Sequence, residues 1–256
     1  MHINLFCQYI ACKMPIAPAV MPHDHEIQVW IIPSFADIPF PRLWDIVLNC
    51  GYSQLVSFEE SQAVQKFIRD RDKNRKLMTF LSRKITLGKL LEIDPADLIF
   101  ESDSFGKPFL PHYSNVHFNI SHSGSHIVLA IGKVPLGIDL EYLDEDFDFH
   151  DMLNSTFQSS EIKSILEAKS PAQKFFDFWT RKEAFVKAIG QGLSIPPIDL
   201  RVDEESNTFS IEKGMNGKNA WICNSSQIIP SYLCSLVYPR SAEMKINIYH
   251  WGDLKG

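Results

Sequence analysis

The sequence predicts an α+β fold made of two similar halves that meet near residue 136. Two observations support this prediction. Segments typical of strands and helices follow one another in the order strand, helices, strands about twice along the chain. In addition, the 256 residues are 45% hydrophobic and include 18 Phe, which is enough for a sizeable core.

The first half is expected to begin with a strand and to continue with helices. Residues 27–32 are rich in β-forming side chains and end before Pro33, which predicts a strand. Two further prolines predict a loop over residues 35–41. Apolar residues three and four apart predict helix over residues 59–91, in more than one piece, with Gly88 as the candidate break. Three shorter elements complete this half: a helical turn after Asp94-Pro95, and strands at 116–120 and 127–131.

The second half repeats this order. After a turn at Val134-Pro135, residues 137–142 predict a strand. Helices are expected at residues 160–168 and 172–189, the second ending at Gly190 and Gly192. Further β-rich segments lie at 200–202, 208–211, 220–223, 232–237 and 245–251. The chain is therefore divided into an N-terminal lobe, residues 26–136, and a C-terminal lobe, residues 137–256.

Residues 1–25 are expected to be a flexible N-terminal extension. The segment is apolar and contains prolines, but it lacks the basic start of a signal peptide. No apolar run reaches the roughly 18 residues needed to span a bilayer, so no membrane association is expected. Five scattered cysteines without a CxxC pair indicate reduced thiols in a cytoplasmic protein. A net charge of −6 argues against nucleic-acid binding.

The sharpest motif is Gly137-Ile138-Asp139-Leu140-Glu141 in a predicted strand. Side chains two apart on a strand share a face, so Asp139 and Glu141 point the same way. Two carboxylates on one face suit a cation such as Mg²⁺, which prefers oxygen ligands. The plain alternative is a solvated strand face, since charged residues are usually exposed.

A second motif lies on the predicted helix 172–189, where Glu183 and Lys187 are four residues apart and share a face. Its alternative is an ordinary surface ion pair. A third motif is the turn that contains Ser121, His122 and Ser123, whose hydroxyl, imidazole and backbone N–H groups can grip a phosphate. A hydrolase with Ser121 or Ser123 as nucleophile is a different interpretation, but no G-x-S-x-G surrounds them. A plain hairpin turn also fits.

Two weaker signals accompany these motifs. Gly106-Lys107-Pro108 predicts a turn that brings backbone and a positive charge close to a ligand, although an ordinary turn would look the same. Residues 66–89 form a basic stretch that includes Arg75 and is interrupted by Asp70 and Asp72. Most of this stretch is expected to be a solvated helix face, from which one or two residues could contact phosphate.

Taken together and in this order, these motifs resemble those of the 4′-phosphopantetheinyl transferase superfamily in its two-lobed monomeric form. That group includes activators of surfactin-type peptide synthetases and of aminoadipate reductase. The resemblance runs from about residue 59 to residue 202. It implies two pseudo-symmetric α/β lobes with the cofactor cleft between them.

The resemblance also implies roles for individual residues. Asp139, Glu141 and Glu183 match metal ligands for Mg²⁺, for which Mn²⁺ could substitute. Glu183 and Lys187 match catalytic residues, as base and as a positive charge near the pyrophosphate. Coenzyme A would contact Lys107 and Pro108 beside the adenine, Ser121, His122 and Lys187 at the phosphates, and Arg75 near the 3′-phosphate.

The activity that the resemblance implies is transfer of the 4′-phosphopantetheine arm of coenzyme A to a serine of an apo carrier protein. Two other functions stay open: a non-catalytic module that binds coenzyme A, and a metal-dependent phosphohydrolase. The carrier also stays open among fatty acid synthase, peptide or polyketide synthases and aminoadipate reductase. We expect a monomer without nucleic-acid or membrane partners.

Overall fold

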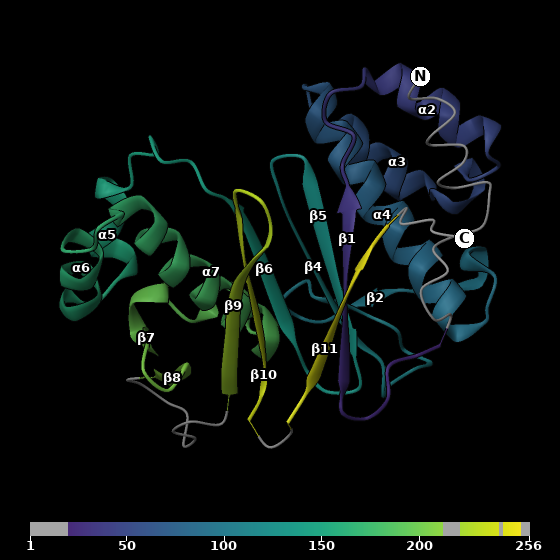
Figure 1. Cartoon of the computed structure of the whole chain (residues 1–256). Helices are drawn as coiled ribbons and strands as arrows, with labels where there is room; N and C mark the ends of the chain where they lie inside the picture. Colours follow the sequence, from purple (N-terminus) through teal and green to yellow (C-terminus); the bar gives the residue numbers. More distant parts are fainter. Residues whose placement is uncertain (1–19, 212–220, 241–242, 252–256) are drawn as a thin grey trace.

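The computed structural model describes residues 20–211, 221–240 and 243–251. Two β-sheets lie side by side at the centre of the molecule, and a group of helices covers the outer side of each (Figure 1). The expected α+β fold is confirmed. None of the helices in the described part of the chain is long and apolar enough to cross a membrane.

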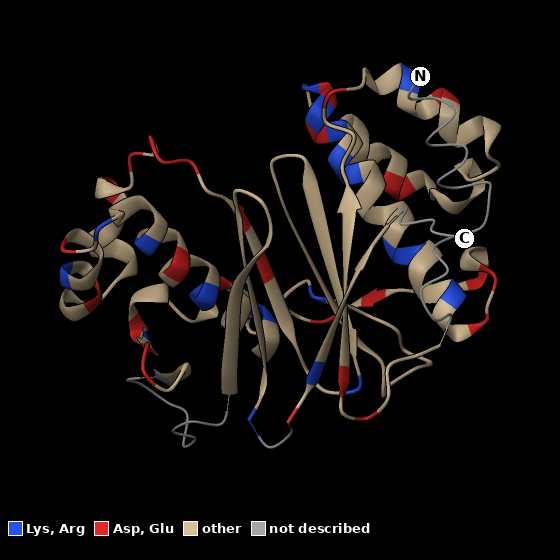
Figure 2. Ribbon diagram, viewed as in Figure 1, with Lys and Arg blue, Asp and Glu red and all other residues tan. Residues whose placement is uncertain are grey.

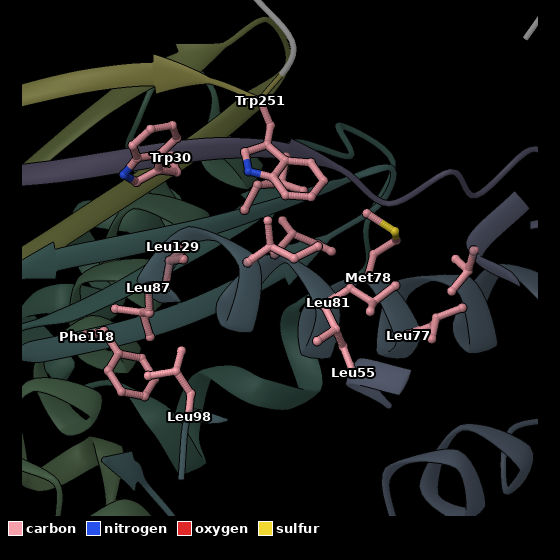
Figure 3. Packing of buried hydrophobic residues seen from close by; sticks show 14 of the residues in the cluster. Trp30, Leu55, Leu77, Met78, Leu81, Leu87, Leu98, Phe118, Leu129 and Trp251 are labelled. Carbon is pink, nitrogen blue, oxygen red and sulfur yellow. The ribbon is translucent and has the colours of Figure 1, made fainter. Parts of the chain in front are cut away.

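The first sheet has the strand order β11-β1-β5-β4. Its strands are β1 (Glu26–Pro33), β4 (His117–Ser123), β5 (His126–Gly132) and β11 (Lys245–His250). The helices α2 (Phe40–Asn49), α3 (Phe58–Gln65) and α4 (Asp70–Leu91) pack on one face of this sheet. In that core Trp30 and Trp251 face apolar side chains of α4, among them Leu81 and Leu87 (Figure 3).

Local signals explain how these helices begin and end. Ser57 and Glu60 form a capping box at the start of α3, each side chain bonding the other residue's backbone N–H. The helix α4 passes through Gly88 without a break and ends at Leu91, and the capping residue Glu92 has a φ of 57°. A methyl group at Gly88 would lie 2.9 Å from the Ile93 carbonyl oxygen, so this glycine allows a close approach of the following turn.

Two helices were not predicted from the sequence. The loop expected over residues 35–41 is replaced from Phe40 onward by α2, in which Pro41 stands in the first turn, where a missing N–H costs nothing. The second is α5 (His150–Thr156), a seven-residue helix. A small hairpin of β2 (Glu101–Ser102) and β3 (Pro108–Phe109) was also missed. Short 3₁₀ turns lie at Ser53–Leu55, Pro95–Asp97, Gly192–Ser194 and Pro197–Asp199.

The second sheet has the order β6-β10-β9-β8-β7. Its strands are β6 (Gly137–Tyr142), β7 (Leu200–Asp203), β8 (Thr208–Ile211), β9 (Trp221–Ile229) and β10 (Tyr232–Pro239). The helices α5, α6 (Ser159–Leu166) and α7 (Pro171–Ile189) pack against it through a phenylalanine-rich core. The strand expected at 220–223 extends to Ile229, and its residue 220 lies outside the described residues.

A third apolar cluster joins the two sheets. Side chains of β1 and β5, such as Ile27 and Val128, meet side chains of β6 and β10, such as Ile138 and Leu236. The last strand, β11, pairs in parallel with β1 and thus lies in the first sheet, although the sequence places it after the second lobe. The division into lobes at residue 136 and the extension at 1–25, largely outside the described residues, stay predictions.

Candidate active site

Strands β4 and β6 come from different sheets and are joined through side chains. The backbone N–H groups of Ile138, Leu140 and Tyr142 donate to Asn119, Ser121 and Ser123, at 2.9, 3.3 and 3.0 Å respectively. Residues two apart on a strand share a face, so three alternate side chains of β4 meet three alternate N–H groups of β6. We call these three residues of β4 the polar ladder.

The ladder also places the two carboxylates predicted on β6. Ser121 donates a hydrogen bond of 2.8 Å to Oδ1 of Asp139, and Ser123 donates one of 2.9 Å to Oε2 of Glu141. Asp139 is 3% exposed and Glu141 is half-buried. The expectation of two carboxylates on one strand face is confirmed, and the alternative of a solvated face is wrong for Asp139.

Helix α7 supplies the remaining charged groups. The helix lies so close to β6 that a methyl group at Gly137 would stand 2.1 Å from the Ala184 carbonyl oxygen. This contact brings Nζ of Lys187 to 2.6 Å from Oδ1 of Asp139 and to 3.0 Å from Oγ of Ser121. Figure 2 shows acidic segments on β6 and basic segments on α7 and on the first half of α4.

Burial and mutual repulsion raise the pKa of two carboxyl groups at this site. The pKa of Glu183 is raised, first by burial and then by the negative charge of Asp139. The pKa of Glu141 is raised for the same two reasons in the same order, against the lowering effect of hydrogen bonds from Ser123 and Trp179. A base with a raised pKa next to a lysine is suited to proton transfer.

The three carboxylates Asp139, Glu141 and Glu183 fit a divalent cation in their chemistry. Oδ2 of Asp139 is buried and accepts no hydrogen bond, although a buried polar atom normally has a partner. Among the described residues, however, no three His, Cys, Asp or Glu side chains are already grouped to hold a metal ion. Ligation by all three residues therefore stays a prediction.

A cavity of about 300 Å³ opens beside these residues. Glu183 and Lys187 from α7 line it together with Asn119 of the ladder, and residues of the turn before β3 also line it. A larger cavity of about 500 Å³ lies elsewhere in the second lobe, between α6, β7 and β8. That larger cavity contains none of the predicted site residues, so its size does not identify the site.

His122 stands near the basic part of α4. Its pKa is lowered to about 4, first because surrounding atoms desolvate the ring and then because of the charge on Arg75. Lys187 and Lys76 add to the lowering of the His122 pKa. The ring is therefore neutral at pH 7. The same positive charges create a positive electrostatic potential that favours binding of an anion. Arg75 itself pairs with Asp72 at 2.8 Å.

Lys107 contacts the protein rather than open solvent. Its Nζ donates to the carbonyl oxygens of Lys187 at 2.6 Å, Leu136 at 3.1 Å and Ala188 at 3.3 Å. The side chain thus satisfies the end of α7, where the last carbonyl groups of a helix lack partners within it. Burial lowers the pKa of Lys107 to about 8. Lys107 and Pro108 both line the 300 Å³ cavity, and the adenine contact stays a prediction.

The site contains three residues to which the sequence analysis gave no role or a different role. Asn119 and Ser123 belong to the polar ladder, and Phe105 lines the cavity. The signal that could have found the first two is their spacing of two from Ser121 on a strand, which puts all three on one face. Ser123 was considered as part of a phosphate-binding turn or as a nucleophile, but its hydroxyl is bonded to Glu141.

Comparison with known proteins identifies the family. Residues 135–237 match the model of the 4′-phosphopantetheinyl transferase superfamily. Residues 42–133 match a second model, described as 4′-phosphopantetheinyl transferase, N-terminal. The two models together cover both halves of the chain, from α2 to β10.

Curated relatives carry the same name. A 4′-phosphopantetheinyl transferase of Bacillus subtilis is 36% identical over 144 residues, which are 55% of this chain and 63% of that protein. The 4′-phosphopantetheinyl transferase gsp of Aneurinibacillus migulanus is 32% identical over 72% of this chain and 76% of its own length. The Sfp enzyme of Bacillus subtilis strain 168 is 29% identical over 58% of this chain and 66% of its own length. The matches thus span about two thirds of these relatives, and the chain belongs to the 4′-phosphopantetheinyl transferase superfamily as a two-domain member of the Sfp type.

Proposed function

We propose that this protein transfers the 4′-phosphopantetheine group of coenzyme A to a serine of an apo carrier protein domain. The products are the holo-carrier protein and adenosine 3′,5′-bisphosphate. The observation that carries the proposal is the convergence of a carboxylate, a lysine and a serine from three elements. Asp139 of β6, Lys187 of α7 and Ser121 of β4 are mutually bonded where the two sheets meet.

The charges around this point support a phosphate-rich substrate. Lys187 lies on one side of Ser121, and Arg75 and Lys76 are close enough to His122 to lower its pKa. Coenzyme A carries a pyrophosphate and a ribose 3′-phosphate, which need more than one positive group. We assign the pyrophosphate to Ser121 and Lys187, and the 3′-phosphate to His122 with Arg75.

Mg²⁺ would be held by Asp139, Glu141 and Glu183, and Mn²⁺ should substitute because it accepts similar oxygen ligands. The unbonded Oδ2 of Asp139 and the raised pKa values of Glu141 and Glu183 support this assignment. When bound, the cation supplies polarisation of the phosphoryl group and compensation of charge on the leaving group.

The protein residues account for the proton and the charge. Glu183 takes the proton from the carrier serine, whose oxygen then bonds to the phosphorus that carries the pantetheine arm. The bond from that phosphorus to the bridging oxygen of the pyrophosphate breaks, and its electron pair leaves with the bisphosphate. Lys187 places its positive charge near the leaving phosphate, where negative charge develops.

A monomer in the cytoplasm is part of the proposal. One chain supplies all parts of the site, from β4 in the first sheet, from β6 in the second sheet and from the helix α7. Cys223 and Cys234 are buried free thiols, as expected in a reducing compartment.

The test separates the proposed reaction from its two alternatives. The protein is incubated with coenzyme A and Mg²⁺, with and without an apo carrier domain, and the products are measured by mass spectrometry. A transferase releases the bisphosphate only with the carrier, which gains the mass of the arm. Release without carrier would indicate a phosphohydrolase, and no release in either sample would indicate a binding module. Apo domains from the candidate synthases and from aminoadipate reductase, compared side by side, identify the carrier class.

A further inference from the structure

The ladder residue Ser123 has a place in the site that the proposed chemistry does not use. Its hydroxyl donates to Oε2 of Glu141 at 2.9 Å and accepts from the backbone N–H of Tyr142 at 3.0 Å. It thus holds both a carboxylate side chain and the backbone next to it. Ser121 makes the equivalent pair of contacts with Asp139 and Leu140.

The two serines differ in what else fixes their carboxylate. Asp139 is also held by Lys187, so its orientation does not depend on Ser121 alone. Glu141 has a hydrogen bond from the neutral Trp179 in place of an ion pair, its side chain is longer with more rotatable bonds, and it lies at the end of β6, next to the exposed Tyr142. A carboxylate on such a side chain loses rotational freedom when it binds a cation, unless a neighbour has already oriented it.

We propose that Ser123 is a positioning residue, which orients the Glu141 carboxylate toward the cation site and couples that orientation to contact between the two lobes. Because Ser123 belongs to β4 and Glu141 to β6, the bond exists only while the two strands lie side by side. The bond to Oε2 fixes one oxygen of this carboxylate, and Trp179 adds a second hydrogen bond to the same group. This inference rests on the proposed function, in which Glu141 is a metal ligand.

The experiment measures metal binding directly. Mn²⁺ is titrated into protein with saturating coenzyme A and no carrier, and free Mn²⁺ is followed by its electron paramagnetic resonance signal, with a coenzyme A blank. Ser123→Ala is expected to raise the Kd for Mn²⁺ about tenfold, the usual loss when a residue that orients a metal ligand is removed. At saturating metal, kcat should recover most of its wild-type value.

Matched variants separate orientation from folding. Ser123→Thr keeps the hydroxyl and should bind Mn²⁺ as the wild type does. Ser123→Val has the shape of the threonine variant but no hydroxyl, so it should bind Mn²⁺ as weakly as Ser123→Ala. The control is Ser125→Ala. Ser125 also joins the lobes, through Tyr232 at 3.1 Å, but contacts neither carboxylate of β6. It should leave the Kd for Mn²⁺ unchanged, and urea unfolding checks each variant's stability.

The outcomes distinguish this inference from the function on which it rests. If the wild type binds no Mn²⁺ with coenzyme A, the metal assignment fails, and this inference fails with it. If the wild type binds Mn²⁺ and Ser123→Val binds it equally well, the positioning role is wrong while the function stands. If Ser125→Ala weakens Mn²⁺ binding as much as the Ser123 variants do, the change in Kd arises from contact between the lobes alone. That result would also overturn the role of Ser123.

Discussion

The ammonium group of Lys187 lies 2.6 Å from Oδ1 of Asp139, so α7 places a positive charge on the most buried carboxylate of the site. The contact joins residues 48 positions apart in the sequence. It leaves Oδ2 of the same carboxylate without a hydrogen bond. One oxygen of Asp139 is therefore neutralised by the protein, while the other is available to a cation.

Replacing Glu183 by Gln should nearly abolish transfer. The substitution keeps the shape of the side chain but removes both the base and a proposed metal ligand, which should cost on the order of a hundredfold or more in kcat. The rate of carrier modification is measured by mass spectrometry, and circular dichroism checks the fold. Near-normal turnover by folded protein would remove Glu183 from the mechanism.

Replacing Asp139 by Ala should raise the Mg²⁺ concentration needed for half-maximal activity. Loss of a carboxylate oxygen weakens a site for a cation that prefers oxygen ligands. The measurement is a Mg²⁺ titration of the initial rate, with Asp146→Ala as the control, because Asp146 is an exposed carboxylate in the loop after β6. Wild-type activity that survives exhaustive chelation would contradict the metal assignment.

His122→Ala should selectively impair the use of coenzyme A over dephospho-coenzyme A. A charge-assisted hydrogen bond to the 3′-phosphate is worth about 1.5–3 kcal/mol, so its loss should cost roughly tenfold to a hundredfold in kcat/KM. Dephospho-coenzyme A lacks this phosphate. The loss in kcat/KM from removing the His122 side chain and the loss from removing the 3′-phosphate should therefore not add, because both remove the same contact. If the variant discriminates between the substrates as strongly as the wild type does, Arg75 becomes the better candidate.

The protonation of His122 should respond to coenzyme A. In the free protein its pKa is lowered, because desolvation by neighbouring atoms and nearby positive charges disfavour the imidazolium form. A bound phosphate dianion has the opposite effect and should raise this pKa. NMR titration of the histidine ring signals, assigned with His122→Ala, should show the shift with coenzyme A and a smaller one with dephospho-coenzyme A. Equal shifts would place the 3′-phosphate elsewhere.

Two lysines of α7 should give opposite phenotypes when each is replaced by Met. Lys182 is 1% exposed and bonds Glu161 at 2.6 Å, so Lys182→Met leaves a buried charge unpaired and should cost about 3–5 kcal/mol of stability. Lys187→Met should instead lower kcat and change stability less. Urea unfolding and the rate per folded molecule are compared. A stable, inactive Lys182→Met protein would contradict the purely structural role of Lys182.

Gly137→Ala should separate α7 from β6 and lose stability and activity together. The added methyl group would stand 2.1 Å from backbone oxygen of Ala184 and 2.3 Å from backbone nitrogen of Ala188, where no side chain can rotate away. Gly132→Ala is the control, because its methyl group would meet a side-chain atom of Leu136 at 3.1 Å. If urea unfolding gives Gly137→Ala the same free energy of unfolding as the wild type, the tight contact between α7 and β6 is contradicted.

Local patterns in the sequence predicted most elements and the faces on which the candidate site residues lie. Alternation of apolar and charged residues predicted β6 with Asp139 and Glu141 on one face, and helical spacing put Glu183 and Lys187 together on α7. These patterns work because the faces of a strand and a helix depend only on near neighbours in the chain. The helix α2 was missed because prolines at residues 39 and 41 favour a loop locally, and packing of Leu43 and Val47 overrides them.

Contacts between distant segments were decided only by the tertiary structure. The sequence could place Lys107 in a turn. Its hydrogen bonds to the end of α7 join residues about 80 positions apart, however, and local periodicity carries no information about such contacts. The same holds for the polar ladder between β4 and β6 and for the return of β11 to β1. The sequence by itself thus determined which side chains could do the chemistry, and the packing of two sheets decided which of them meet.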